Sequence, residues 1–593
     1  MNLSISKGRP MGVVRRLVVS LAVTAVVSLV SPAQAFQPGD SLPPEIATGT
    51  RQKPLVETGE EMIVTANPEA SRAGAAVLAR GGTAIDAAIA AQLVLGLVEP
   101  QSSGLGGGAF LVYYNAKTGR LTTLDAREAA PAAANPKRFD GLSLADAVES
   151  GLSTGVPGTP RLIEEMHRRY GTLPLGDLAA RAVELARGGF EISPRLADSI
   201  KASDRIPDDP TAKAYFFNED GTPKAAGTLL RNEDYARSVM ALVDHGNADA
   251  YYSGPMRDDI IAAVKREPRP GDLAAEDFDA YRVKEREPVC GKYRGYKVCG
   301  MGPPSSGGIA VAQILAMLEP FDMAAAGPNT AQSVHLYTQA NRLAFADRNR
   351  YVADTDFIDV PVKGLLEPGY LASRSRLIDP DKDMGVAEAG EPPFKSGRFI
   401  EGVHHDLPAT SHMSIVDKDG NAVSMTTTIE SAFGSGRMVR GYMLNNELTD
   451  FSFAAGTPEQ PVANRVEPGK RPRSSMAPTI IFDQDGKVKY VLGSPGGSSI
   501  ISYVAQSVVA LIDWGLDPQQ AAALPHFQNN NGKAPATLLE AGTSVTDLAS
   551  ELERRGHAVA PTELTSGLSI IAVGDKRLLG GADIRREGIA AGR

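Results

Sequence analysis

The chain has 593 residues, a length that favours roughly four domains if each holds about 150 residues. Apolar residues make up 42% of the chain and charged residues 22%, which is typical of a globular protein and excludes a fully disordered or fibrous one. The formal net charge is −9 at pH 7, so the chain lacks the basic face that contact with nucleic-acid phosphates requires. We therefore expect a folded protein that does not bind nucleic acid.

The first 35 residues have the three parts of a secretory signal peptide. The apolar stretch 17–30 is too short for a comfortable membrane span, and Ala33-Gln34-Ala35 matches an A-x-A cleavage site. Basic residues precede that stretch: Lys7, Arg9, Arg15 and Arg16. We expect a periplasmic or secreted mature chain that starts at Phe36, has no stable membrane span and, after loss of four basic residues and no acid, carries a net charge of −13. An uncleaved anchor is the alternative.

The two cysteines of the chain, Cys290 and Cys299, lie in the segment CGKYRGYKVCG. A two-residue turn at Arg294-Gly295 places Tyr293 opposite Tyr296 and, three pairs further out, one cysteine opposite the other. Such a non-hydrogen-bonded pair brings the Cα atoms closest, within disulfide range. We expect a structural disulfide, because export leads to an oxidising compartment. Two free thiols are the alternative, and a nucleophilic cysteine is not expected.

The mature part contains helical and strand-like patterns. Residues 71–98 favour two helices separated by Gly81-Gly82, and the second is the kind of apolar helix that lies in a core. The other patterns are a strand at 109–114, helices at 159–190, 327–349 and 498–515, and hairpins with DGN and DG turns at 412–429 and 476–494. Residues 380–408 are polar and aperiodic, as in an exposed linker. The combination is an α+β or layered α/β texture.

Three weak motifs point to other chemistries. Gly151-Leu152-Ser153-Thr154-Gly155 matches the G-x-S-x-G nucleophile elbow, but a helical pattern precedes it where that motif needs a strand. His404-His405-Asp406 lacks a second ligand set at zinc spacing, so we expect a solvated linker and no metal. The glycine-rich runs lack the lysine of a phosphate loop and the Rossmann spacing, and turns explain them better.

Thr410 lies where the expected linker meets the first hairpin, in the segment ATSHMSIVD. A threonine hydroxyl in mid-chain is a weak nucleophile. It becomes a useful one at a chain terminus, because its own α-amine can then act as the base. From the residue alone, an ordinary strand threonine is the better interpretation.

A set of ordered motifs changes that interpretation. From about Ile63 onward the chain resembles the γ-glutamyltransferase (glutathione hydrolase) family of N-terminal-nucleophile hydrolases. The matching segments are MIVTANPEASRAGAAVLARGGTAIDAAIAA, VEPQSSGLGGGAF, LDAREAAP, PPSSGGI, TSHMSIVDKDGNAVSMTTT, FGSG, LNNELTDF, KRPRSSMAPTI and GSPGGSSI. The resemblance implies an α+β fold of four αββα layers, in which two stacked antiparallel sheets lie between helices. It also implies one folded unit rather than a string of domains.

The resemblance further implies a precursor that cuts itself between Ala409 and Thr410. The products would be a large chain, 36–409, and a small chain, 410–593, which form a heterodimer. Thr410 would form a γ-glutamyl ester and pass the acyl group from glutathione or another γ-glutamyl compound to water, an amino acid or a peptide. By match, Thr428 orients the nucleophile, and the backbone N–H groups of Gly496 and Gly497 form the oxyanion hole. No metal or organic cofactor is implied.

The charged residues of the motifs suit a zwitterionic substrate end. Arg127 can pair with an α-carboxylate in fork geometry, and Ser474 and Ser475 can add donors to the same group. Glu447 and Asp450 can take the α-ammonium. Without the resemblance, surface charges or turn residues would be the better interpretation of each.

Two departures from the family pattern leave the donor open. Glu430 stands where the best-known members carry an asparagine that contacts the α-amine. The segment between Asp450 and Ser474 has no tyrosine, so we expect a reduced lid and a more open site. The runner-up activity is that of class IV cephalosporin acylases, which remove a glutaryl-like group. Action on poly-γ-glutamate is a further option, and an inactive exported binding protein is the alternative from a different class.

Overall fold

The computed structural model describes residues 47–394, 397–402, 407, 409–532 and 536–593. The expected signal peptide, its cleavage site after Ala35 and the segment His404-His405-Asp406 lie outside these residues. Those that are described fall in one compact unit. Within the described ranges, no helix is long and apolar enough to cross a membrane.

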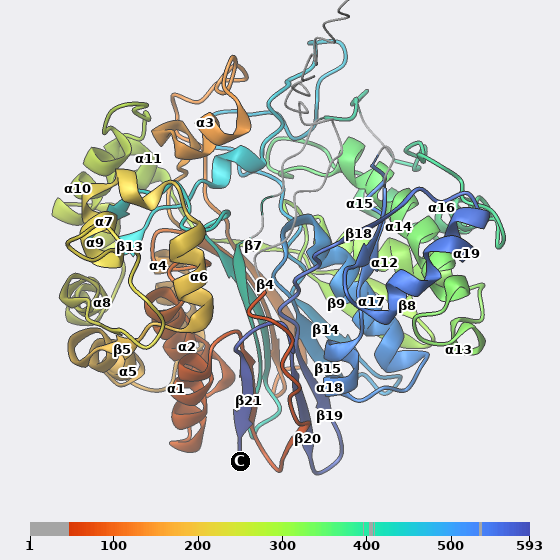
Figure 1. Ribbon diagram of the computed structural model, residues 1–593, viewed down its shortest axis with the longest axis horizontal. Helices are drawn as coiled ribbons and strands as arrows, with labels where there is room; N and C mark the ends of the chain where they lie inside the picture. The colour runs from red at the N-terminus through yellow and green to blue at the C-terminus, as the bar shows by residue number, and fades with distance from the viewer. Residues whose placement is uncertain (1–46, 395–396, 403–406, 408, 533–535) are drawn as a thin grey trace, which may run out of the picture. The chain divides into compact units, whose positions relative to one another are not determined.

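Two seven-stranded antiparallel sheets form the centre of the described part (Figure 1). The first sheet has the order β21 (Ile589–Gly592), β2 (Met62–Thr65), β10 (Thr410–Val416), β11 (Ala422–Thr428), β3 (Gly108–Asn115), β4 (Arg120–Ala126) and β7 (Lys284–Arg286). The second sheet has the order β1 (Val56–Thr58), β20 (Leu578–Ala582), β19 (Ser569–Val573), β15 (Val488–Gly493), β14 (Thr479–Phe482), β9 (Tyr296–Gly300) and β8 (Val289–Tyr293).

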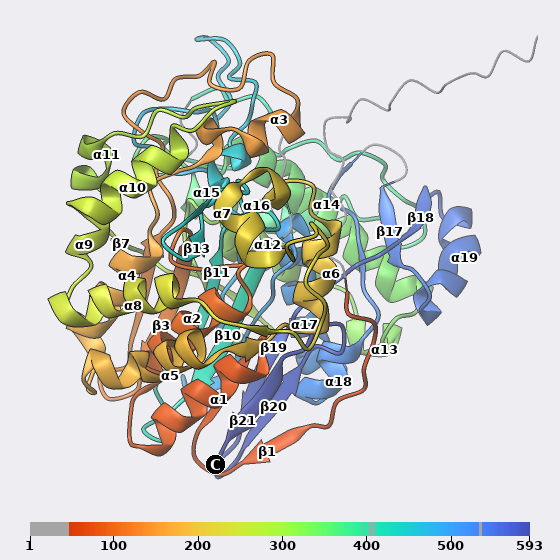
Figure 2. The same ribbon diagram turned by 60° about the vertical axis from the view of Figure 1, so that its left-hand side comes forward.

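The sheets stack face to face, with β10 and β11 packed on β15. Val64, Val112 and Val491 contribute to one buried apolar cluster that is shared by both sheets. Helices cover the outer faces, as Figures 1 and 2 show. They are α1 (Pro68–Ala79), α2 (Ala84–Val98), α4 (Thr159–Tyr170) and α5 (Leu175–Gly188) on the side of the first sheet, and α12 (Gly307–Leu318), α14 (Ala331–Tyr351), α17 (Ile500–Ile512) and α18 (Pro518–Ala523) on the side of the second. The expected αββα arrangement is confirmed.

The helices follow the sequence patterns with one difference. α1 and α2 flank the Gly81-Gly82 break, and every residue of α2 is buried. A buried charge is tolerated in α2 because Asp86 caps the helix, accepting from the N–H of Thr83 at 2.9 Å. The expected helix over 159–190 is two helices, because the chain turns at 171–174 and Pro174 precedes α5.

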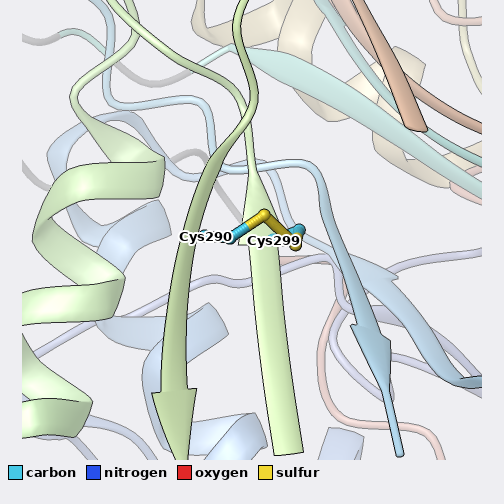
Figure 3. Close-up of a disulfide and its surroundings, with 2 residues drawn as sticks. All are labelled: Cys290 and Cys299. Atoms are coloured by element: carbon cyan, nitrogen blue, oxygen red, sulfur yellow. A yellow bond between two sulfur atoms is a disulfide. The ribbon is translucent and has the colours of Figure 1, made fainter. Parts of the chain in front are cut away.

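The cysteine hairpin has the expected register. β8 and β9 pair Tyr293 with Tyr296 and Cys290 with Cys299 around a turn at Arg294 and Gly295, whose φ angles are 50° and 83°. Both positive angles are those of a type I′ turn, which matches the twist of the strands. A disulfide joins Cys290 to Cys299 with a Cα–Cα distance of 4.1 Å (Figure 3).

The G-x-S-x-G segment lacks the strand of a nucleophile elbow. The helix α3 (Leu144–Glu149) precedes it, and the 3₁₀ turn η1 (Gly151–Ser153) contains the serine. Ser153 is buried, and its hydroxyl lies 2.8 Å from the carbonyl oxygens of Val148 and Ser150. This hydroxyl is a local cap rather than a nucleophile.

Candidate functional site

The hairpin of β10 and β11 places Thr410 opposite Thr428 at its open end. Its tight turn depends on Asp417, whose Oδ1 accepts from the N–H groups of Asp419 at 3.0 Å and Asn421 at 2.9 Å. Gly420 completes that turn with a φ of 81°. Because the register is fixed along the whole hairpin, the two threonine side chains lie on the same face of the sheet.

The hydroxyl of Thr428 joins three groups around Thr410. It donates to the carbonyl oxygen of Ala409 at 2.6 Å. It accepts from the N–H of Glu430 at 2.8 Å and lies 3.4 Å from the hydroxyl of Thr410, which donates to it. A hydroxyl has one proton and two acceptor sites, so this arrangement uses all of them. The proton of Thr428 therefore points at the carbonyl before Thr410.

A glycine turn approaches the same place from the second sheet. Gly496 and Gly497 have φ angles of 132° and 56°, in the region that L side chains rarely adopt. A Cβ on Gly496 would lie 2.6 Å from the ring of Tyr503. The 3₁₀ turn η4 (Gly497–Ser499) leads directly into α17, so backbone N–H groups at this turn add to the positive end of a helix.

Arg127 is the buried cation of the site. It follows β4, is 1% exposed, and forms ion pairs with Glu447 and Asp450. These two acids are the ends of the 3₁₀ turn η3 (Glu447–Asp450). Arg127 also donates to the carbonyl oxygens of Pro472 at 3.3 Å and Arg473 at 3.1 Å. Although burial favours the neutral form, the two carboxylates raise the pKa of Arg127.

Four buried carboxyl groups lie at this site. Glu128, Glu447 and Asp450 act on the charge of Arg127, and Glu430 lies close to Glu447 and Asp450. Burial raises the pKa of Glu128 to about 7, and burial together with the neighbouring acids raises the pKa values of Glu430 and Glu447 well above the ordinary range. Burial and neighbouring like charges act in the same direction here, since both favour the protonated form of a carboxyl group. The described part of the site is therefore rich in acids whose pKa values are raised.

Glu430 links the cluster to the segment before Thr410. Its carboxyl oxygens accept from the side chain of Asn446 at 2.6 Å and from the N–H of Leu407 at 2.8 Å. Its φ is 80°, a strained value for a residue with a side chain. The surrounding contacts hold Glu430 in this conformation.

A small cavity of about 20 Å³ lies among these groups, enough for about one water molecule. Its lining residues are Arg127, Leu407, Thr410, Thr428, Glu430, Glu447, Asp450, Ser474, Ser475, Met476, Gly497 and Ile500. The structure thus brings the sequence-predicted catalytic and binding residues into one place, except that Gly496, like the cleavage-site residue Ala409, is next in the chain to a lining residue. No residue of 451–473 lines it, yet Thr410 is only 3% exposed. Leu407, from the segment before Thr410, contributes to the lining of this cavity, and the reduced lid expected from the missing tyrosine stays a prediction.

Comparison with known proteins decides the family. The family model described as gamma-glutamyltranspeptidase matches residues 70–593. The chain belongs to the gamma-glutamyltranspeptidase family. It is 37% identical over 545 residues to the glutathione hydrolase proenzyme of Escherichia coli, covering 89% of this chain and 91% of that protein. The glutathione hydrolase proenzyme of Bacillus subtilis is 35% identical, with 97% and 98% covered.

A solved acylase has the same fold as this gamma-glutamyltranspeptidase family member. The cephalosporin acylase from Bacillus halodurans superposes with a TM-score of 0.81 at 28% identity, covering 92% of this chain and 98% of that one. The recognised family and its N-terminal-nucleophile hydrolase fold are therefore confirmed, and the chain is an enzyme of that family. In the described residues, no group of three or more His, Cys, Asp or Glu side chains could hold a metal ion.

Sequence reasoning missed three residues that touch this gamma-glutamyltranspeptidase site. Glu128 follows Arg127 directly, so its place in the same motif was a usable signal. Asn446 precedes the two acids of η3 and could have been found in the same way. Arg348 donates to Ser475 at 2.6 Å from the distant helix α14, and no local pattern indicates that contact.

Proposed function

We propose that this protein is a γ-glutamyl acyltransferase and hydrolase that acts on glutathione and related γ-glutamyl compounds through Thr410. The observation that carries the proposal is the position of the Thr410 hydroxyl. It lies 3.4 Å from the hydroxyl of Thr428 and lines the same small cavity as Arg127, Glu447 and Asp450. A nucleophile, its orienting group and a charged recognition site are thus adjacent.

Thr410 first acts on its own chain. Its Oγ1 attacks the carbonyl carbon of Ala409, the hydroxyl proton passes to the Thr410 nitrogen, the bond from that carbon to the nitrogen breaks, and an ester forms. Water hydrolyses the ester, which leaves the carboxylate of Ala409 and a free α-amine on Thr410. The hydrogen bond from Thr428 to the Ala409 oxygen, 2.6 Å long, stabilises the negative charge that develops there. The products, 36–409 and 410–593, stay together as a heterodimer.

The freed amine then serves as the base for acyl transfer. It takes the hydroxyl proton of Thr410 while Oγ1 attacks the γ-carbonyl carbon of the donor. The N–H groups of Gly496 and Gly497 stabilise the oxyanion, the leaving amine takes a proton, and a γ-glutamyl ester remains. Water releases glutamate, whereas an amino acid or peptide acceptor takes the acyl group. None of these steps needs a metal or an organic cofactor.

When the donor binds, the two charges of its zwitterionic end take the places that the charges of the site hold in each other's ion pairs. Its α-carboxylate pairs with Arg127 and accepts from Ser474 and Ser475, and its α-ammonium faces Glu447 and Asp450. Every buried charge thus keeps an opposite charge beside it, which keeps the desolvation cost of the buried groups low. Burial and the neighbouring acids raise the pKa of Glu430, which favours its protonated form, and the carbonyl oxygen of that form can accept from the ammonium as an amide would.

The acylase activity is the second candidate because of the structural likeness to the Bacillus halodurans acylase. A glutaryl group has no ammonium, so it would leave the acids of the site without a cationic partner other than Arg127. Three acids, Glu430, Glu447 and Asp450, line the cavity. This excess of carboxyl groups favours a donor with an amine. An inactive binding protein is disfavoured, since the paired hydroxyls of Thr410 and Thr428 are both present.

The destination of the protein follows from its first residues. We infer export to the periplasm or medium, with cleavage after Ala35 and a large chain that starts at Phe36. N-terminal sequencing of both chains from a bacterial expression host tests the two cuts together. A large chain that retains residues 1–35 would contradict the export step and leave the chemistry at Thr410 untouched.

The activity is tested with γ-glutamyl-anilide and glutaryl-anilide, using wild type, Thr410→Ala and Thr410→Ser. We expect wild type to be cut before Thr410 and to prefer the γ-glutamyl donor. Thr410→Ala should stay uncut and inactive, whereas Thr410→Ser should be cut and retain activity, because serine keeps both the hydroxyl and the amine. A wild-type chain that is fully active without being cut would overturn the mechanism, and a preference for glutaryl-anilide would favour the acylase.

A further inference from the structure

We propose that Arg348 is a positioning residue for the donor's α-carboxylate, which it serves through the hydroxyl of Ser475. The inference rests on the proposed function and adds a residue to its recognition site. Arg348 lies near the end of α14, is buried, and is not among the residues that line the small cavity. Ser475 does line it. Arg348 is therefore placed to act on the donor through Ser475.

The contacts of Arg348 bind it to both sides of the serine segment. Its Nη2 donates to Ser475 Oγ at 2.6 Å, and its Nε donates to Ser306 Oγ at 2.9 Å. Its carbonyl oxygen accepts from Arg473 at 3.0 Å. Because a guanidinium is planar and keeps its charge, these donors hold a fixed relative geometry. Arg348 thus fixes the position of the Ser475 oxygen from behind.

Ser306 holds Ser474, the residue next to Ser475, through hydrogen bonds. The N–H and the hydroxyl of Ser306 both donate to the carbonyl oxygen of Ser474, at 2.8 Å and 2.7 Å. Ser474 donates its own N–H to the carbonyl oxygen of Pro304 at 3.0 Å. The segment 304–306 and Arg348 therefore hold residues 474–475 as one unit. A shift of either serine would have to break several buried hydrogen bonds.

The direction of the Arg348 contact decides what Ser475 can do. A guanidinium only donates, so Ser475 Oγ accepts from it and the hydroxyl proton must point elsewhere. Ser474 is set in the same way, since its Oγ accepts from the N–H of Met476 at 3.1 Å. Hydroxyls that accept on one side are stronger donors on the other. Both hydroxyl oxygens are thus held by donors of the protein, on two residues that line the cavity, which fixes where each oxygen lies relative to a donor's carboxylate.

Arg127 and Arg348 reach the serine segment from different elements. Arg127 follows β4 and donates to the carbonyl oxygen of Arg473 at 3.1 Å, whereas Arg348 on α14 donates to Ser475 Oγ at 2.6 Å. The two cations would therefore have different roles, since Arg127 contacts the carboxylate and Arg348 sets the hydroxyl donor that meets it.

The test compares two donors that differ only in the α-carboxylate. γ-Glutamyl-anilide carries it, and 4-aminobutyryl-anilide has the same amine and amide without it. For Arg348→Met, we expect kcat/KM for γ-glutamyl-anilide to fall about 10- to 100-fold, mainly through KM, as loss of one charge-assisted hydrogen bond predicts. The value for 4-aminobutyryl-anilide should change by less than about threefold. Arg348→Lys should recover part of the loss, because it keeps the charge but not the fork.

Two controls separate this role from a structural one. Arg350→Met removes another arginine of α14, one that donates to the carbonyl oxygen of Phe399 at 2.9 Å, and should leave both donors unchanged. In a Ser475→Ala background, Arg348→Met should have little further effect on γ-glutamyl-anilide, since the two act as one unit. Equal losses for both donors, or additive effects of Arg348 and Ser475, would overturn the proposal. A wild type that turns over neither donor would instead contradict the proposed function.

Discussion

Thr428→Val removes one hydroxyl and keeps nearly the same side-chain volume, so it tests the hydrogen bonds around Thr410 directly. The variant loses the donor to the Ala409 oxygen and leaves the N–H of Glu430 without its 2.8 Å acceptor. An unpaired buried N–H costs about 1–3 kcal/mol of stability. Loss of one donor to a developing oxyanion slows a reaction by about 10²- to 10³-fold. We therefore expect cleavage before Thr410 to slow by that factor.

The assay is the disappearance of the full-length chain with time on a denaturing gel, starting from freshly refolded precursor. Thr428→Ser keeps the hydroxyl and should be cut within about tenfold of the wild-type rate. Thr427→Val is the matched control, because its hydroxyl donates to the carbonyl oxygen of Gly108 at 3.3 Å, away from Ala409. It should be cut at the wild-type rate. Cleavage of Thr428→Val as fast as that of Thr427→Val would refute the reasoning.

Three further predictions concern stability, each measured by urea unfolding of the uncut Thr410→Ala chain. The raised pKa of Glu430, caused first by burial, means that its contribution to stability is lost as pH rises above the ordinary carboxyl value of 4.5. Glu430→Gln should reduce that loss of stability. An unchanged pH profile would contradict the raised pKa of Glu430. Burial lowers the pKa of His335, and that of His557 to about 4, so stability should fall as pH drops from 6.5 toward 4. His557→Gln should weaken this acid sensitivity. If the variant is as acid-sensitive as the parent chain, the His335–His557 pair does not cause the loss of stability. Reduction of the Cys290–Cys299 disulfide, which closes a short loop, should cost about 2–3 kcal/mol, whereas no change would mean that the strands alone hold the hairpin.

The predicted acid sensitivity of the His335–His557 pair depends on a series of hydrogen bonds that all run in one direction. His335 Nε2 lies 2.8 Å from the carbonyl oxygen of Asp379, which only accepts, so this nitrogen carries a proton. Its Nδ1 then accepts from His557 Nε2 at 2.8 Å, and His557 Nδ1 accepts from the hydroxyl of Thr537 at 2.9 Å. Each ring is neutral in this arrangement. A proton added to His335 Nδ1 would face the Nε2–H donor of His557 and break the hydrogen bond between the two rings.

Local patterns were sufficient to predict most elements of the fold. The turn residues Arg294 and Gly295 set the register of the cysteine hairpin, and the DGN turn does the same for the strands that carry Thr410 and Thr428. Pro174 lies at the break inside 159–190, but the helical patterns before and after it made the segment resemble a single helix. These are short-range features, so the sequence contains nearly all the information that they need.

Long-range contacts were harder to predict. Arg127 was expected to meet a substrate carboxylate, and in the structure it pairs with Glu447 and Asp450, more than 300 positions away. Arg348 meets Ser475 only because α14 runs toward the serine segment. The family resemblance supplied the candidate site residues, but it carried no information on how their charges are paired. Such contacts depend on the packing of whole layers, which residue patterns do not specify.

The sheet order bears on what cleavage at Thr410 would do to the fold. In the first sheet, β10 and β11 lie between β2 and β3, so strands from 410–593 are hydrogen-bonded on both sides to strands from 36–409. The same interleaving occurs in the second sheet, where β14 pairs with β9. Separation of the two pieces would expose these buried inner strands and their unpaired backbone groups. Breakage of the single bond before Thr410 would therefore create a terminal amine while the two chains stay hydrogen-bonded to each other. We expect the two chains to unfold as one cooperative unit.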